Sequence, residues 1–162
     1  MTNEPPAAGS SPQPTAQTLP VQGFANVVVR GLLRTPGLSR LVGSRLVVVY
    51  VVGRKSGRRY DVPVAYTRHG DALLIGTPFG WGRNLRTGEP VDILFKGKRR
   101  PADVEVFTSE ADVAAQYTVM SKDNRQFARF NKIRLAADGT VNPDDLHAAW
   151  VGGARAFRLV PR

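Results

Sequence analysis

The chain has 162 residues, enough for one domain with a substantial core, and its hydrophobic content of 42% and charged content of 22% are ordinary for a globular protein. It contains no cysteine, which excludes disulfides, iron–sulfur clusters and thiol catalysis, and its two histidines, His69 and His147, are too far apart in sequence to suggest a zinc site. The net charge of +10 is unusual and uneven: residues 21–60 hold eight Arg and Lys and no Asp or Glu, whereas residues 101–162 hold eight of each. We therefore expect a local cationic surface.

The first twenty residues contain five prolines and no basic residue, so they lack the charged start and apolar centre of a secretory signal. We predict a disordered tail over residues 1–20, followed by one domain over residues 21–162. No apolar run reaches the roughly 18–20 residues of a transmembrane helix, and the simplest location is the cytoplasm.

Residues 24–42 have the apolar spacing of a helix, interrupted at Pro36-Gly37, and Arg30, Arg34 and Arg40 give it a basic side. Two interpretations stay open. The favoured one is a helix that covers the core and exposes its basic side to solvent. The other is a helix that rests on anionic lipid, which would bring the protein into peripheral membrane contact.

The middle of the chain predicts strands. The run Leu46–Val52 is apolar throughout, as in a strand buried on both faces, and glycine-containing turns separate several of the segments that follow. Short connections between most strands favour an antiparallel barrel or a strongly coiled sheet, in a mainly β (α+β) protein. Six strands are expected, at residues 46–52, 61–68, 71–77, 91–96, 102–108 and 154–160.

Helices are expected late in the chain. Ser109 is placed to cap a helix over residues 110–121, and Asp123 or Asn124 a second segment through Ile133. Asn142 followed by Pro143 and two acidic residues predicts the start of a third helix.

The segment that carries most chemistry is the loop 53–59, Gly-Arg-Lys-Ser-Gly-Arg-Arg, between two predicted strands. Two glycines bend a loop that presents four cations and a hydroxyl, so it can offer backbone N–H groups and positive charge to one anion. Arg54 can bind a phosphate bidentately, and Lys55 can act as a mobile point charge. A solvated basic turn is the alternative, at about equal weight; a nucleic-acid patch is disfavoured because no aromatic residue is interleaved with the cations.

A second informative segment follows the strand at 71–77. Gly76 permits close approach to the backbone, and Gly80 and Gly82 permit a loop that wraps around a ligand. Strand-edge amides and bulky apolar side chains suit a flat heteroaromatic ring. Trp81 and Asn84 are spaced as on one face of a helical turn, and a core Trp with Asn84 bracing a turn is equally compatible.

Together these segments resemble the deazaflavin-dependent nitroreductase family, over about residues 46–108. The resemblance lies in the order of Gly53–Gly57, Pro63, the turn at Gly70, Gly76-Thr77 and the segment from Trp81 to Asn84, followed by Pro90-Val91. That family belongs to the split β-barrel flavin and deazaflavin oxidoreductases, is abundant in actinobacteria and uses coenzyme F420, a deazaflavin with a phosphodiester and an oligoglutamate tail. The resemblance therefore implies a split β-barrel and F420 as cofactor, with no metal.

The resemblance also implies roles for particular residues. The hairpin loop would hold the phosphate or the anionic tail of the cofactor. The strand segments Val62–Val64 and Gly76-Thr77 would contact the ring through backbone groups. Trp81 and Asn84 match an aromatic residue and an Asn in the family's loop-to-helix segment. A lipophilic substrate would meet Phe79 and the late aromatic residues, which partly match a tyrosine-rich helix of the family. The residues implied for the cofactor are Arg54, Lys55, Ser56, Gly57, Arg58, Arg59, Val62, Pro63, Val64, Gly76, Thr77, Trp81 and Asn84, and those for the substrate are Phe79, Phe127 and Phe130.

The expected reaction is hydride transfer from reduced F420 to a lipophilic quinone, enone or nitro compound. Solvent can supply the proton; among side chains, Tyr66 and Tyr117 are the candidates. An FMN-dependent oxidoreductase on the same barrel, a non-catalytic deazaflavin-binding protein and, less favoured, a nucleic-acid-binding barrel are the alternatives. Split barrels of this kind often pair, so the resemblance also allows a homodimer, although the sequence does not fix the oligomeric state.

Overall fold

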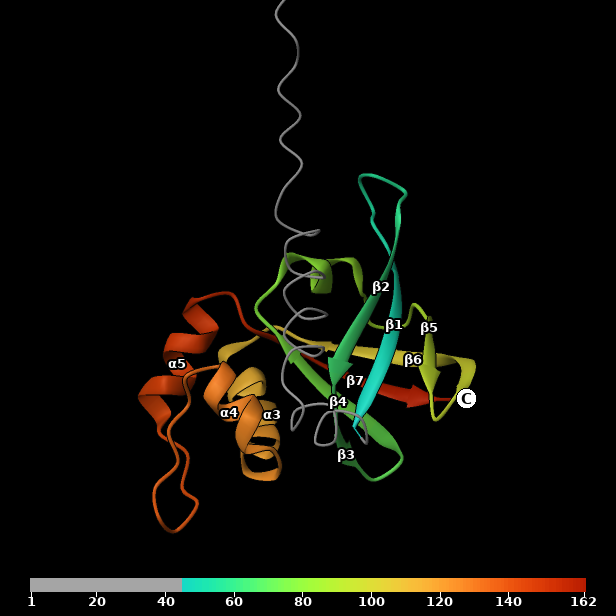
Figure 1. Ribbon diagram of the computed structural model, residues 1–162. Helices are drawn as coiled ribbons and strands as arrows, with labels where there is room; N and C mark the ends of the chain where they lie inside the picture. The colour runs from blue at the N-terminus through green and yellow to red at the C-terminus, as the bar shows by residue number, and fades with distance from the viewer. Residues whose placement is uncertain (1–44) are drawn as a thin grey trace, which may run out of the picture.

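The computed structural model describes residues 45–162, in which a seven-stranded sheet curls into a half-barrel and three α-helices pack on one side (Figure 1). Every pair of neighbouring strands is antiparallel, in the order β2-β1-β5-β6-β7-β4-β3. This confirms the predicted mainly β architecture with late helices. The predicted tail, the helix at 24–42 and the start of the proposed domain lie outside the described residues. The strands are β1 (Leu46–Val52), β2 (Arg59–Ala65), β3 (Thr67–His69), β4 (Ala72–Thr77), β5 (Val91–Phe95), β6 (Lys98–Phe107) and β7 (Arg155–Pro161).

Three strand predictions differ from the structure. The predicted strand 102–108 starts too late: β6 begins at Lys98, because Phe95 already pairs with Lys98 across a turn of two residues. The predicted strand 61–68 is two strands, β2 and β3, because the chain breaks at Tyr66, which packs edge-on against Phe95 with ring centroids 5.4 Å apart. The prediction that β1 is buried on both faces is wrong: Val47, Val49 and Val51 face the core, whereas the residues between them are partly accessible and Val52 is 53% exposed. The uniform run of valines conceals this period of two, since Val occurs on both faces.

The concave side of the half-barrel holds one hydrophobic core. Side chains from β1, β4, β5 and β7 meet there, and the indole of Trp81 stacks on Phe157 with centroids 6.1 Å apart. A second core, centred on Tyr117 and Met120, joins the helices to the other side of β4 and β7. Both faces of β4 are therefore covered, which explains why four consecutive residues, 72–75, are buried.

The late helices begin at the predicted caps. They are α3 (Glu110–Asp123), α4 (Arg125–Phe130) and α5 (Pro143–Val151). Ser109 Oγ accepts a hydrogen bond from the N–H of Asp112, and Asn124 and Asn142 cap α4 and α5 in the same way. The helix α4 ends earlier than predicted because Lys132 is left-handed (φ 58°) and the N–H of Ile133 turns back to Ala128 O at 2.8 Å.

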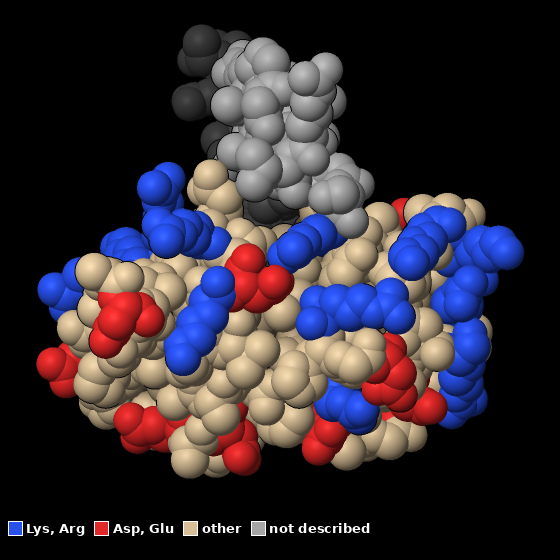
Figure 2. All heavy atoms as spheres, turned by 90° about the horizontal axis from the view of Figure 1, so that it is seen from below, with Lys and Arg blue, Asp and Glu red and all other residues tan. Residues whose placement is uncertain are grey.

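The described surface carries charges of both signs. Lys and Arg side chains extend over the face shown in Figure 2, with Asp and Glu interspersed among them. Several of these groups are paired, such as Arg134 with Asp145 and Arg162 with Asp103. Within residues 45–162, no helix is both long enough and apolar enough to cross a membrane.

Candidate functional site

The loop between β1 and β2 is a closed hairpin, and a glycine is required at its two glycine positions for different reasons. The N–H of Gly53 donates to Arg58 O at 2.8 Å and the N–H of Gly57 to Gly53 O at 2.7 Å. Gly57 is left-handed (φ 64°), a conformation that glycine adopts without steric cost. At Gly53 a Cβ would lie 2.6 Å from Ser56 Oγ. Ser56 Oγ in turn accepts the N–H of Arg58 at 3.3 Å and lies 3.3 Å from the hydroxyl of Tyr60.

Arg54 links this hairpin to a second segment, the 3₁₀ helix η1 (Gly80–Asn84). The backbone N–H of Arg54 donates to Asn84 Oδ1 at 3.0 Å, and its side-chain Nε donates to the backbone O of Asn84 at 3.3 Å. Asn84 Nδ2 donates to Trp81 O at 2.9 Å, so the amide braces the turn and binds the hairpin at once. The predicted spacing of Trp81 and Asn84 on one helical turn is confirmed, and Asn84 acts first as a structural brace.

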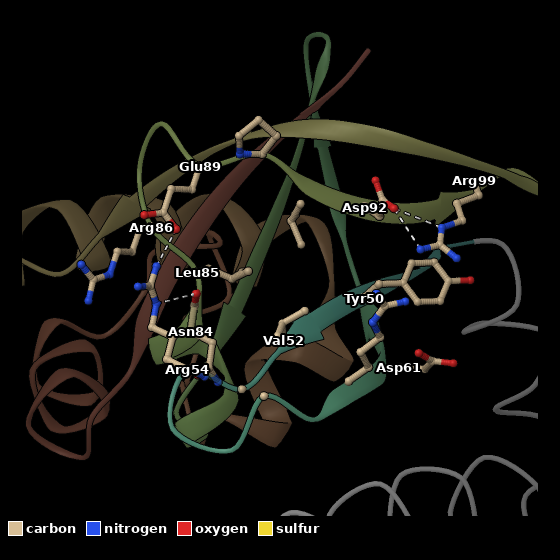
Figure 3. A pocket seen from close by; sticks show the side chains of 15 residues that line it. Tyr50, Val52, Arg54, Asp61, Asn84, Leu85, Arg86, Glu89, Asp92 and Arg99 are labelled. Carbon is tan, nitrogen blue, oxygen red and sulfur yellow. Dashed lines mark hydrogen bonds and ion pairs between the residues drawn. The ribbon is translucent and has the colours of Figure 1, made fainter.

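A groove of about 710 Å³ lies between the hairpin, η1 and the start of β5. Its volume is within the range of small-molecule sites. The middle of the groove is apolar, with Val52 and Leu85 between its two polar ends (Figure 3). The groove is lined by Tyr50, Val52, Gly53, Arg54, Gly57, Arg59, Asp61, Asn84, Leu85, Arg86, Glu89, Pro90, Val91, Asp92 and Arg99.

At one end of the groove lie Arg54, Arg86 and Glu89 (Figure 3). Arg54 Nη2 donates to Glu89 Oε2 at 2.5 Å, and both side chains are accessible, at 36% and 61%. Arg86 belongs to the same turn as Glu89, whose N–H donates to Arg86 O at 3.1 Å. Within residues 45–162 neither Arg86 nor Arg59 forms an ion pair.

At the other end the guanidinium of Arg99 lies 4.3 Å from the ring centroid of Tyr50 and donates twice to Asp92 Oδ2, at 3.2 and 2.9 Å. This cation–π stack covers one face of the ring. Over the whole groove four arginines face three carboxylates. The groove is therefore cationic by one charge, far less than the hairpin sequence alone implies.

The structure brings together only part of the predicted cofactor set. Arg54, Gly57, Arg59 and Asn84 line the groove, whereas the exposed side chains of Lys55, Ser56 and Arg58 lie on the same hairpin but are not among the lining residues. The segments predicted to contact a ring, Val62–Val64 and Gly76–Thr77, do not line the groove either.

These two segments share a different property, because each lies on an edge of the sheet. β2 is the first strand in the sheet order, so among described strands only β1 pairs with it. β3 pairs with β4 only at residues 72–74, so one side of β4 at Ile75–Thr77 has no strand partner among the described residues. Pro63, which has no N–H to donate, is tolerated on such an edge. The predicted contact with a ring requires backbone N–H and C=O groups at a strand edge, because these are not used in pairing with a neighbouring strand.

Gly76 also has a packing role that the sequence does not reveal. A Cβ at Gly76 would lie 2.8 Å from Tyr117, 2.9 Å from Phe127 and 3.0 Å from Met120. The glycine thus lets α3 and α4 approach β4 closely. Gly82 does the same for η1, since its Cβ would lie 2.8 Å from Phe157.

The predicted substrate residues and proton donors lie away from the groove. Phe79 and Phe130 approach each other with centroids 6.2 Å apart, and Phe130 is 62% exposed. Phe127 packs edge-on against Tyr117. Tyr117 is fully buried; its hydroxyl donates to Arg155 O at 3.4 Å, and burial raises its pKa. Tyr66 is also buried, at 8% exposure.

The acidic side of the site and its aromatic end are not among the residues predicted from the sequence. Glu89 and Asp92 precede and begin β5, and Tyr50 and Arg99 come from β1 and β6. One signal was present in the sequence: Tyr50 lies between Val49 and Val51 and takes the opposite face. The partners of Arg54 and Arg99 had no sequence signal, because they depend on which strands pair.

Comparisons with protein-family models and with curated proteins give no match. Among solved structures, the chain is similar to a "putative 5-nitroimidazole antibiotic resistance protein" of Bacteroides thetaiotaomicron, at 12% identity and a TM-score of 0.46, over 76% of each chain. It is also similar to a pyridoxamine 5'-phosphate oxidase-related, FMN-binding protein of Nostoc punctiforme, at 12% identity and a TM-score of 0.45, over 85% of this chain and 80% of that one. At this level of similarity neither structure transfers functional information to this chain.

Proposed function

We propose that the protein is an oxidoreductase that binds a phosphate-bearing flavin-type cofactor, coenzyme F420 in the first place, and passes a hydride from it to a lipophilic electrophile. The observation that carries the proposal is the position of Arg54. It lies at the tip of a hairpin, is fixed to Asn84 by two hydrogen bonds, and lines a groove with Arg59 and Arg86.

The groove residues fit a phosphate group. Arg presents a planar fork that matches phosphate oxygens bidentately, and Arg59 and Arg86 have no carboxylate partner among the described residues. The apolar side chains of Val52 and Leu85 between the polar ends can cover the uncharged part of a ligand. In this proposal Lys55 and Arg58, exposed on the same hairpin, attract the anionic tail of F420.

The ring is proposed to meet two strand edges, Val62–Val64 and Gly76–Thr77, through backbone groups; neither edge has a strand partner among residues 45–162. When bound, the deazaflavin supplies the hydride, and the protein contributes binding, orientation and shielding from water. The edge of β4 lies next to the aromatic residues, since a Cβ at Gly76 would touch Phe127. Phe79, Phe127 and Phe130 are therefore the proposed contacts of a quinone, enone or nitro compound.

The proton is proposed to come from solvent. The hydroxyl of Tyr117 is buried and bonded to a backbone carbonyl, which disfavours it as a donor to a ligand. The predicted homodimer, the cytoplasmic location and the peripheral membrane contact stay predictions.

FMN is the second candidate cofactor, because its phosphate makes the same demand on Arg54. A titration of the purified protein with F420 and with FMN, each oxidised and reduced and followed by fluorescence at physiological salt, separates the two. We expect F420 to bind with a dissociation constant in the micromolar range or below. If only FMN binds, the assignment of the groove as the cofactor site stands and the cofactor is FMN instead of F420. Binding of neither would refute the proposal.

The double substitution Arg54→Ala with Lys55→Ala tests the residues. It should raise the cofactor dissociation constant at least tenfold, roughly the effect of losing charge-assisted hydrogen bonds to a phosphate. The control, Arg68→Ala with Lys98→Ala, removes the same charge from outside the groove and should change it little. Equal effects would mean that only net charge matters. Turnover with a panel of quinones, enones and nitro compounds then distinguishes an enzyme from a cofactor-binding protein.

A further inference from the structure

The ion pair between Arg54 and Glu89 occupies the point at which the proposed function requires an anion. Arg54 cannot easily turn away from it, since Asn84 holds both its backbone N–H and its Nε. A third nitrogen of Arg54, Nη2, donates a hydrogen bond to the carboxylate of Glu89. The carboxylate of Glu89 therefore uses the part of the guanidinium that would face a ligand in the groove.

Glu89 is held in place by its own turn. The N–H of Gly88 donates to Val104 O at 3.0 Å, and Thr87 Oγ1 accepts the N–H of Val106 at 2.9 Å. Gly88 is left-handed (φ 83°), and Glu89 N–H closes the turn on Arg86. This turn is thus tied to β6, so Glu89 stays within reach of Arg54 at a high effective concentration.

We propose that Glu89 is a built-in competing anion, and that the phosphate of the ligand takes its place on Arg54. The inference rests on the proposed function only in naming the ligand; the exchange itself needs no more than a phosphate group. A phosphate group is favoured in the exchange because a second non-bridging oxygen can also engage Arg86, which lies in the same turn as Glu89 and has no ion-pair partner among the described residues. Both members of the Arg54–Glu89 pair are accessible, so the pair is weak enough to be displaced.

The test is the substitution Glu89→Gln, with inorganic pyrophosphate as the probe and isothermal titration as the assay. The free energy of an exposed ion pair corresponds to a factor of roughly two to five in an equilibrium constant. We therefore expect Glu89→Gln to bind pyrophosphate more tightly than the wild type by about that factor. The matched control is Asp71→Asn, which changes the net charge equally and removes one of the two carboxylate partners of Arg158, away from the groove. It should leave the dissociation constant unchanged.

A double-mutant cycle isolates the competition. In an Arg54→Ala background the gain from Glu89→Gln should disappear, since no contested cation remains. Four outcomes would overturn the inference. Glu89→Gln gains affinity also in the Arg54→Ala background, its gain equals that of Asp71→Asn, or it gains no affinity. The fourth outcome is that neither the wild type nor Glu89→Gln binds pyrophosphate measurably. Unchanged melting temperatures show that the variants are folded.

The same variants separate this inference from the proposed function. If Glu89→Gln gains pyrophosphate affinity through Arg54 while neither F420 nor FMN binds, the exchange stands and the cofactor proposal fails. If a cofactor binds to the wild type and Glu89→Gln alters neither its affinity nor that of pyrophosphate, the exchange fails alone.

Discussion

Replacing Gly76 with alanine distinguishes a glycine required for packing from one required by a ligand. The added Cβ would lie 2.8 Å from Tyr117, 2.9 Å from Phe127 and 3.0 Å from Met120. Real Cβ atoms avoid such distances, so three side chains from two helices must shift. Over-packing of this kind costs about 1–3 kcal/mol, and the lower entropy of the unfolded alanine chain offsets about 0.5 kcal/mol.

We therefore expect Gly76→Ala to lower the free energy of unfolding by about 1–2 kcal/mol, or the melting temperature by roughly 4–8 °C in a domain of this size. Denaturant titration and thermal melting measure both quantities. Gly80→Ala is the matched control, because nothing lies within 4 Å of its Cβ and its φ is not in the left-handed region. Adding Phe127→Leu to Gly76→Ala should recover part of the loss.

The outcome that refutes the packing argument is a Gly76→Ala protein with wild-type stability. If such a protein also loses cofactor binding, Gly76 is required by the ligand and the ring contact proposed from the sequence gains support. If it loses stability and still binds the cofactor, the glycine serves the approach of the helices.

Two further predictions concern pH. Hydrogen bonds from the side chain and backbone of Arg134 hold the pKa of Asp145 below its usual range, so their stabilising effect is complete above the unfolded pKa of about 3.9 and is lost as pH falls through the lower folded value. Melting temperatures at pH 6 and pH 3 should differ less in Asp145→Asn than in the wild type; an equal difference would assign the acid sensitivity to other groups. Burial raises the pKa of Tyr117, so its hydroxyl should stay protonated in the folded protein at a pH at which the same tyrosine ionises in the unfolded chain, and stability should fall as pH rises above about 10. Phenolate absorbance and unfolding at pH 9 and pH 11 check this, with Tyr117→Phe expected to lose part of the alkaline effect; a full titration of all four tyrosines near pH 10 in the folded state would contradict it.

Local sequence patterns predicted the elements that depend on neighbouring residues. The caps Ser109, Asn124 and Asn142 begin their helices as expected, because the hydrogen bonds that define a cap reach only two or three residues along the chain. The brace from Asn84 to Trp81 O is of the same kind. The hairpin loop, predicted at residues 53–59, was likewise evident from its glycines and the flanking strands, although Arg59 belongs to β2.

The face of each strand and the partners of each charged group were decided by the tertiary structure. Val47 and Val48 are identical in sequence, yet one is buried and the other only partly, because the curl of the sheet places a core on one side of β1. Glu89 lies 35 residues from Arg54, and Asn84 lies 30 residues from it. Local sequence patterns do not specify pairings between residues so far apart along the chain.

Local patterns along the chain specify a mainly antiparallel β protein with late helices and a basic hairpin that can face an anion. Three features follow instead from tertiary packing: the hairpin borders a groove, the carboxylate of Glu89 is paired with Arg54, and Gly76 lets two helices approach β4. The difference is one of range, because turns and caps arise from contacts between near neighbours, whereas the groove forms where β1, η1 and β5 meet through the packing of a shared core.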